Sequence, residues 1–316
     1  SFALFIVFSF LLPTDANVLA DVLNLSGRAN SGYWFAVMAI MALIWGFSTW
    51  FYTSRLFSLA AFIALGISIF RLGEFFDELE VYALLFIFVT LTGLGGAYIL
   101  KHWQSQKFSM PLLILVQIAQ LALNAFALTA IAIRLDDFPN TWNLASAFFW
   151  LLTAGFYVLS DLTFAFVLFP WLAGVSLYLV PLAFMMIFDV EALPIAIVTW
   201  AWGGLLAFGS EILRHMQGEK IRRYILPLLV TSILVTLTAT LIGYVEEITY
   251  GFGFILASAI LYAILHILKP RVYLWVTALL LGLGAYFSFF ALPFMEELEV
   301  FSGYQLLGVS LLLLTP

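Results

Sequence analysis

The chain has 316 residues, of which 65% are hydrophobic, 18% aromatic and only 9% charged, and its mean hydropathy is +1.12. This composition excludes a soluble globular domain and is typical of an integral membrane protein. The 12 Lys and Arg residues are too few for a surface that binds nucleic acid, and the lack of cysteine excludes disulfides, thiolate metal sites and a cysteine nucleophile.

Apolar stretches separated by charge and turn signals predict the membrane helices. A helix that spans a bilayer needs about 20 mostly apolar residues. The chain holds twelve such stretches, which predict an all-α integral membrane protein with about 12 transmembrane helices. In order they cover residues 1–24, 33–53, 55–73, 81–103, 111–134, 142–160, 162–187, 192–214, 224–245, 251–268, 271–292 and 300–316. Both ends of the chain fall abruptly in or after apolar runs, so we expect it to be truncated at both ends.

An internal repeat is visible when the sequence is compared with itself. Residues 96–104 (GAYILKHWQ) match residues 209–217 (GSEILRHMQ), and residues 77–81 match residues 296–300. The period of roughly 110 residues predicts three tandem four-helix repeats over residues 1–108, 109–221 and 222–316. An even number of spans per repeat makes the repeats parallel, not inverted. The alternative is that Leu- and Phe-rich segments resemble one another through composition alone.

The charges divide between the two membrane faces that this segmentation defines. One face carries three basic and fifteen acidic residues, and the other carries three acidic residues with nine basic ones: Arg55, Lys101, Lys107, Arg214, Lys220, Arg222, Arg223, Lys269 and Arg271. The positive-inside rule assigns the basic face to the cytoplasm. We therefore expect both ends of the chain on the cytoplasmic side of a bacterial inner membrane.

Acidic residues cluster at corresponding turns of the three predicted repeats, on the outer face. Such carboxylates could attract cations, but helix N-termini favour acids in any case and the spacing does not match a calcium loop. We expect no metal site there. The clusters consist of Glu74, Asp77, Glu78, Glu80, Asp189, Glu191, Glu296, Glu297 and Glu299.

A polar stripe runs along the predicted helix 111–134, where Gln117, Gln120 and Asn124 share one face near the bilayer midplane. Thr236 and Thr240 occupy the corresponding positions of helix 224–245. These side chains either line a polar pathway or a lipid headgroup site, or form hydrogen bonds between helices, which is the commoner use of such residues in membranes.

Ionisable residues that could couple ions, bind a metal or catalyse a reaction are scarce elsewhere. Asp161 is expected at a turn and Glu211 within one helical turn of Arg214, so neither predicts an ion-coupling site. The three His residues lie near helix ends, which argues against haem or another metal cofactor. The usual enzyme signatures are missing, and the sequence favours a protein that is not an enzyme and has no cofactor.

Two functions from different classes remain. The first is transport or translocation of a lipid or another largely apolar solute, without an ion-coupling site. The second is a non-enzymatic structural subunit that holds other subunits of a membrane-protein complex. Both predict membrane lipids as partners. Transport predicts a cavity lined by Gln117, Gln120 and Asn124, whereas a scaffold predicts that these side chains are satisfied between helices.

Overall fold

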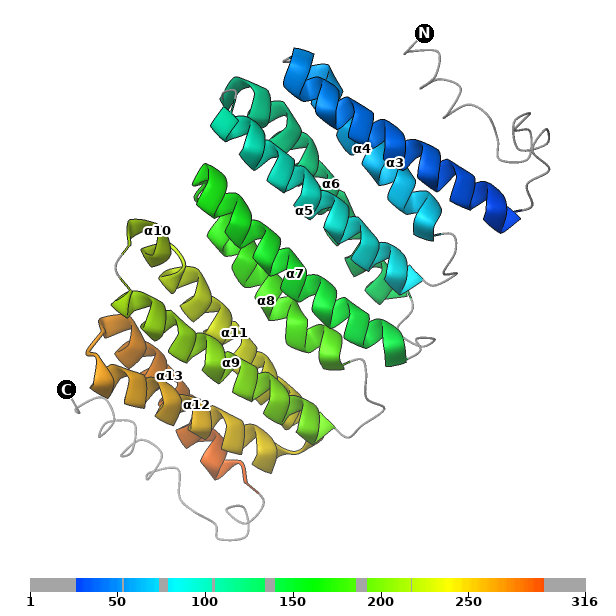
Figure 1. Ribbon diagram of the computed structural model, residues 1–316. Helices are drawn as coiled ribbons and strands as arrows, with labels where there is room; N and C mark the ends of the chain where they lie inside the picture. The colour runs from blue at the N-terminus through cyan, green and yellow to red at the C-terminus, as the bar shows by residue number, and fades with distance from the viewer. Residues whose placement is uncertain are drawn as a thin grey trace. The chain divides into compact units, whose positions relative to one another are not determined.

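The computed structural model describes residues 27–292 apart from residues 53, 74–78, 104–105, 134–139, 186–191 and 217. These described residues form ten long α-helices and one helix of four residues, α10 (Figure 1). The chain divides into two compact units, Ser1–Arg134 and Leu135–Pro316, which we call unit 1 and unit 2.

Unit 1 contains two helical hairpins. Its described helices are α3 (Gly27–Tyr52), α4 (Arg55–Gly73), α5 (Leu79–Trp103) and α6 (Gln106–Ile133). Very short connections follow α3 and α5, so each of these helices turns back and packs along the next one as an antiparallel pair (Figure 1). Helix α4 also contacts α5 and α6, and this contact joins the two hairpins.

Unit 2 contains three helix pairs with α11 at their centre. Helix α7 packs against α8, α9 against α11, and α12 against α13, while α11 also contacts α8 and α12. The bounds are α7 (Asn140–Phe164), α8 (Leu168–Met185), α9 (Ala192–His215), α10 (Glu219–Arg222), α11 (Ile225–Glu246), α12 (Ile248–Leu268) and α13 (Val272–Phe290).

Nine of the described helices are long and apolar enough to cross a membrane. The tenth long helix, α8, has a shorter apolar segment, Leu168–Ala183. The prediction of an all-α multi-pass membrane protein is therefore confirmed, and ten of the twelve predicted stretches correspond to long helices. The remaining two, 1–24 and 300–316, lie outside the described residues, and the predicted total of 12 spans stays a prediction.

The three tandem repeats also stay a prediction. In the described residues the helices pack as pairs, and the pair α5–α6 lies across the predicted boundary between the first and second repeats, at residues 108 and 109. The division between unit 1 and unit 2 follows Arg134, inside the predicted second repeat. The division into units follows from contacts between residues in space. The repeat is instead a similarity between segments of the sequence.

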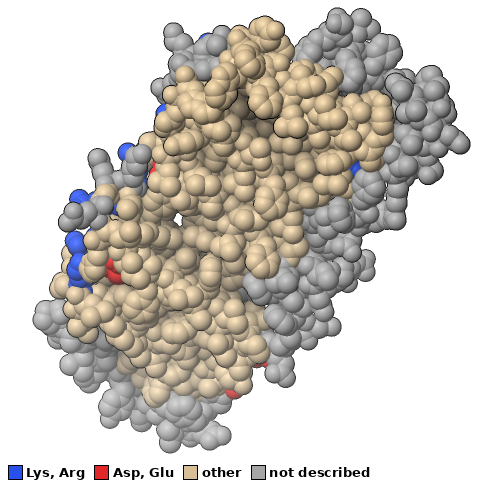
Figure 2. All heavy atoms as spheres, viewed as in Figure 1, with Lys and Arg blue, Asp and Glu red and all other residues tan. Residues whose placement is uncertain are grey.

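Basic residues gather at the end of each unit where the helix pairs turn. In unit 1 these are Arg55 at the start of α4 and Lys101 in the last turn of α5. In unit 2 they are Arg214, Arg222, Arg223, Lys269 and Arg271, and Figure 2 shows blue Lys and Arg atoms along the edge where α10 lies. The assignment of this end to the cytoplasm remains a prediction.

Candidate functional site

The acidic clusters fall almost entirely outside the described residues, as Glu74, Asp77, Glu78, Asp189, Glu191, Glu296, Glu297 and Glu299 all do. Glu80 lies in the first turn of α5, and its side chain is not described. Among the described residues, no group of three or more His, Cys, Asp or Glu residues could hold a metal ion. The question of a cation at the outer face thus rests on the sequence.

The polar stripe of α6 joins this helix to α5. The side chain of Gln120 is fully buried. Its Oε1 accepts a hydrogen bond from Thr90 Oγ1 at 2.6 Å, and its Nε2 donates to Asn124 Oδ1 at 2.9 Å. Gln117 is half-buried on the same helix. These contacts are those expected when polar side chains hold two membrane helices together.

The corresponding residues of unit 2 lie in a buried hydrogen-bond network. Thr236 Oγ1 donates to Ile233 O at 3.0 Å, and Thr240 Oγ1 donates to Thr236 O at 2.9 Å, so both hydroxyl groups bond to their own helix. Ser232 Oγ donates across to Gly203 O on α9 at 2.9 Å and lies 2.8 Å from Tyr262 Oη on α12. Because the Ser232 proton is used, Tyr262 is the donor of that second bond.

Helices α9 and α11 approach each other at Gly203. A Cβ atom added there would lie 2.6 Å from Thr236 Cγ2 and 3.2 Å from the backbone nitrogen of Thr236. Only glycine fits without moving the helices apart. This close approach brings the Gly203 carbonyl within reach of Ser232.

Further hydrogen bonds extend this network to the neighbouring helices of unit 2. Trp200 Nε1 donates to Ser258 Oγ at 3.0 Å and joins α9 to α12, and Trp202 Nε1 donates to Leu177 O at 3.1 Å and joins α9 to α8. Tyr178 Oη lies 3.1 Å from Thr238 Oγ1, between α8 and α11. Unit 2 thus has hydrogen bonds between helices of different pairs.

Asp161 is a buried carboxylate near the end of α7, and its burial is the largest departure from the sequence prediction. The side chain has no exposed surface. Tyr224 Oη, just before α11, donates to Asp161 Oδ2 at 3.0 Å, and Arg223 Nη1 lies 4.0 Å from Oδ1. Among the described residues, none donates a hydrogen bond to Oδ1. A buried carboxylate with two such partners connects the end of α7 to the start of α11.

The sequence placed Asp161 at a turn, but α7 continues to Phe164. The helix ends because Ala165 adopts a left-handed conformation, with φ of 53°. Arg223 Nη1 donates to Ala165 O at 3.2 Å, so one guanidinium holds both the turn and the carboxylate. Since no Gly or Pro marks the helix end, this arrangement has no local signal in the sequence.

Tyr224 lies outside the candidate span Ile225–Glu246 and remains a hydrogen-bond donor at neutral pH. Burial and the hydrogen bond to Asp161 raise the pKa of its phenol well above the ordinary value of 10.0. The phenol therefore keeps its proton over the physiological range. Its hydroxyl group thus remains the donor to Asp161 Oδ2 over that range.

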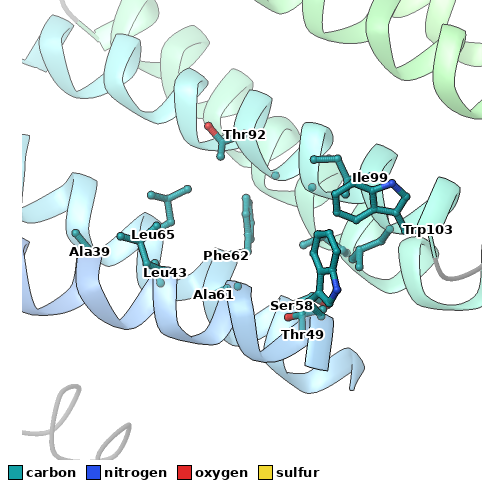
Figure 3. A pocket seen from close by; sticks show the side chains of 17 residues that line it. Ala39, Leu43, Thr49, Ser58, Ala61, Phe62, Leu65, Thr92, Ile99 and Trp103 are labelled. Carbon is teal, nitrogen blue, oxygen red and sulfur yellow. The ribbon is translucent and has the colours of Figure 1, made fainter. Parts of the chain in front are cut away.

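A cavity of about 780 Å³ lies within unit 1, between the α3–α4 hairpin and α5 (Figure 3). Its walls are almost entirely aliphatic, aromatic or glycine. The hydroxyl groups of Thr49, Ser58 and Thr92, which are part of the wall, each donate to a backbone carbonyl of their own helix, at 2.9, 2.8 and 2.7 Å. The volume falls in the range of about 300–1,000 Å³ typical of ligand sites.

The cavity opens to the surface of unit 1, because several of its lining side chains are exposed. Leu43 and Trp103 are 63% and 60% exposed, and both contribute to the wall. The indole rings of Trp50 and Trp103 meet edge to face with centroids 4.2 Å apart. The cavity is therefore partly open to the outside of unit 1.

Sequence reasoning did not find this cavity. None of the residues predicted to line a pathway, Gln117, Gln120 and Asn124, is among those that line it. The signal in the sequence was the presence of small residues on facing helices, including Gly46 and Gly96, which line the wall. Small residues permit both close packing and an open space, and the sequence alone cannot distinguish the two.

No family model matches the chain, and no curated protein or solved structure is significantly similar to it. The fold alone therefore defines the class of protein, a multi-pass all-α integral membrane protein with nine candidate spans among the described residues. The function has to be argued from the cavity of unit 1 and the hydrogen-bond network of unit 2.

Proposed function

We propose that the protein binds a membrane lipid, or another largely apolar solute, in the cavity of unit 1 and translocates it without ion coupling. The observation that carries this proposal is the apolar cavity of about 780 Å³ between α3, α4 and α5. Its three hydroxyl groups already donate to backbone carbonyls, so the wall offers little to a polar solute. A lipid chain loses no hydrogen bond on entering such a space.

The absence of ion coupling is supported by the position of Asp161. This buried carboxylate of unit 2 has Tyr224 and Arg223 as partners, and it does not line the cavity. Coupled transporters generally place an ionisable group beside the substrate or the ion. Asp161 instead connects α7 to α11, which is a structural use of the charge.

Filling the cavity tests the proposal. Gly46 lines it, and a Cβ atom at this position would meet no other atom within 4 Å, so Gly46→Leu can add a side chain to the wall of the cavity without a clash at Cβ. Gly95 is equally open but does not line the cavity, which makes Gly95→Leu the matched control. We expect Gly46→Leu to reduce both the lipid retained by the purified protein and the transfer of fluorescent lipid in vesicles, and Gly95→Leu to reduce neither.

Two results would contradict the proposal. If Gly46→Leu retains and transfers lipid as the wild type does, the cavity is not the binding site. If the wild type retains lipid but moves none between leaflets, binding stands and translocation is wrong.

A structural subunit is the second candidate function, and the network around α11 favours it. Hydrogen bonds between helices of different pairs hold the helices of unit 2 together, which suits a platform for other subunits. The contacts of Gln120 also agree with this function. Gentle purification from the native membrane distinguishes the two, because a platform is recovered with a stoichiometric protein partner and a lipid translocator is recovered with lipid alone.

A further inference from the structure

The cavity of unit 1 occupies one half of the helices that surround it. The residues that line it lie between 39 and 50 on α3, between 58 and 65 on α4, and between 92 and 103 on α5. All three stretches lie toward the end of unit 1 where α3 turns into α4 and where α5 ends. The cavity therefore runs from this end of the helices to about their middle.

The length of this half matches the depth of one membrane leaflet. Gly93 of the wall is the central residue of the candidate span Ala83–Trp103, and Trp103 of the wall is its last residue. The ten residues from Gly93 to Trp103 rise about 15 Å along the helix, at about 1.5 Å per residue. This rise is half of the hydrocarbon core, which is about 30 Å thick. The exposed indole rings of Trp50 and Trp103 meet at the helix ends, and tryptophan is typical of the interface between membrane and water.

The ring of Phe62 crosses the cavity at the depth of Gly93. Phe62 lies on α4, lines the cavity and is only 9% exposed, and Figure 3 shows its side chain pointing toward α5. A Cβ atom added to Gly93 would lie 2.7 Å from Phe62 Cδ2, so the ring reaches the backbone of α5 because glycine has no side chain. Leu43 and Leu65 lie on one side of the ring, and Ser58 lies on the other (Figure 3). The ring thus divides the cavity near the middle of the span.

We propose that Phe62 sets the length of the acyl chain that the cavity accepts. One chain of a lipid from the leaflet at the α3–α4 turn lies along α5, and its methyl end meets the Phe62 ring. A longer chain reaches the space beside Leu43 and Leu65 only by displacing the ring, and overfilling a packed apolar space reduces binding by about fivefold or more. This inference rests on the proposed function, because it names by chain length the class of lipid that the same cavity takes.

The test changes the size of this side chain in the full-length protein. Native mass spectrometry measures which lipids are retained from an equimolar mixture of dilauroyl, dimyristoyl, dipalmitoyl and distearoyl phosphatidylcholine. Phe62→Leu removes the ring and should shift the retained lipids toward longer chains by about fivefold, whereas Phe62→Trp enlarges the ring and should shift them toward shorter chains. Phe88→Leu is the matched control, because Phe88 on α5 is 56% exposed and does not line the cavity, and it should leave the chain lengths unchanged.

The outcomes separate this inference from the proposed function. If the wild type retains lipid and Gly46→Leu does not, but both Phe62 variants retain the same chain lengths as the wild type, the cavity binds lipid and the role of Phe62 is wrong. If Phe88→Leu shifts the chain lengths as much as Phe62→Leu does, the effect does not come from the cavity and the inference is also wrong. If Gly46→Leu retains lipid as the wild type does, the proposed function itself fails. Because the two Phe62 substitutions act in opposite directions, a general loss of stability, which thermal unfolding measures, cannot produce the expected result.

Discussion

In unit 1, Ser68 Oγ donates to Phe35 O and Thr90 Oγ1 to Gln120 Oε1, so these bonds join helices of the same hairpin. In unit 2, Ser232 and Tyr262 join α11 to α12, and Trp200 joins α9 to α12. Unit 1 has an apolar cavity where its first hairpin faces α5, and unit 2 has buried polar contacts between its helix pairs. Polar side chains thus fix the packing in one unit, and the other leaves space that an apolar ligand can enter.

The largest expected effect comes from removing the hydrogen-bond donor to Asp161. Tyr224→Phe leaves a buried carboxylate without this donor and should lower the free energy of unfolding by about 2–3 kcal/mol. Replacing both partners, in Tyr224→Phe with Asp161→Leu, should recover much of this loss, because no buried charge is left unsatisfied. Thermal unfolding in detergent measures the stability of the single and of the double variant. A double variant that is no more stable than Tyr224→Phe would show that the contact contributes little.

The close approach of α9 and α11 gives the next effect. Gly203→Ala brings a Cβ atom against Thr236 and should destabilise unit 2 by about 1–3 kcal/mol. Gly209→Ala, on the same helix, meets no atom within 4 Å and should be neutral or slightly stabilising. Hydrogen exchange of peptides from α9 and α11 should increase in the first variant alone. Equal behaviour of the two variants would mean that these helices are not in close contact.

A smaller effect is expected for the polar stripe of unit 1. Gln120→Leu removes the bonds to Thr90 and Asn124 and should cost about 0.6 kcal/mol, the average for hydrogen bonds between membrane helices. Lipid retention should not change, because Gln120 does not line the cavity. Loss of lipid retention with intact folding would instead assign the stripe to the binding site.

The smallest effect is a pH dependence that Tyr224 contributes. Since its pKa is raised in the folded protein, the stabilisation is fully present below the ordinary tyrosine pKa of about 10 and decreases as the pH rises above that value. The stability difference between the wild type and Tyr224→Phe should therefore narrow above about pH 10. Comparing the two proteins cancels the titration of the other tyrosines. A difference that is constant up to pH 11 would contradict the raised pKa.

The helices could be predicted from the sequence because each needs only a local property, a run of about 20 apolar residues. Ten of the predicted stretches are helices, with ends shifted by a few residues, as where α7 continues past Asp161 to Phe164. Gln120 could be identified as a polar group buried in the membrane. Its partner Thr90 could not, because it belongs to another helix.

The site could not be predicted for the same physical reason. The cavity depends on how far α5 lies from the α3–α4 hairpin, and no local pattern encodes this distance. Asp161 lacks a local signal too, because the residues that allow its burial, Arg223 and Tyr224, lie beyond α8 and α9 in the chain. Predictions from composition and periodicity therefore gave the elements and left the site to be found in three dimensions.

Mapping where a lipid chain contacts the protein tests directly whether the cavity of unit 1 binds lipid. A phospholipid with a photoreactive group on its acyl chain would be crosslinked to the wild type and to Gly46→Leu, and the modified peptides identified by mass spectrometry. We expect adducts concentrated on α3, α4 and α5 in the wild type and strongly reduced there in Gly46→Leu. Adducts spread evenly over both units, or unchanged in the variant, would contradict lipid binding in this cavity.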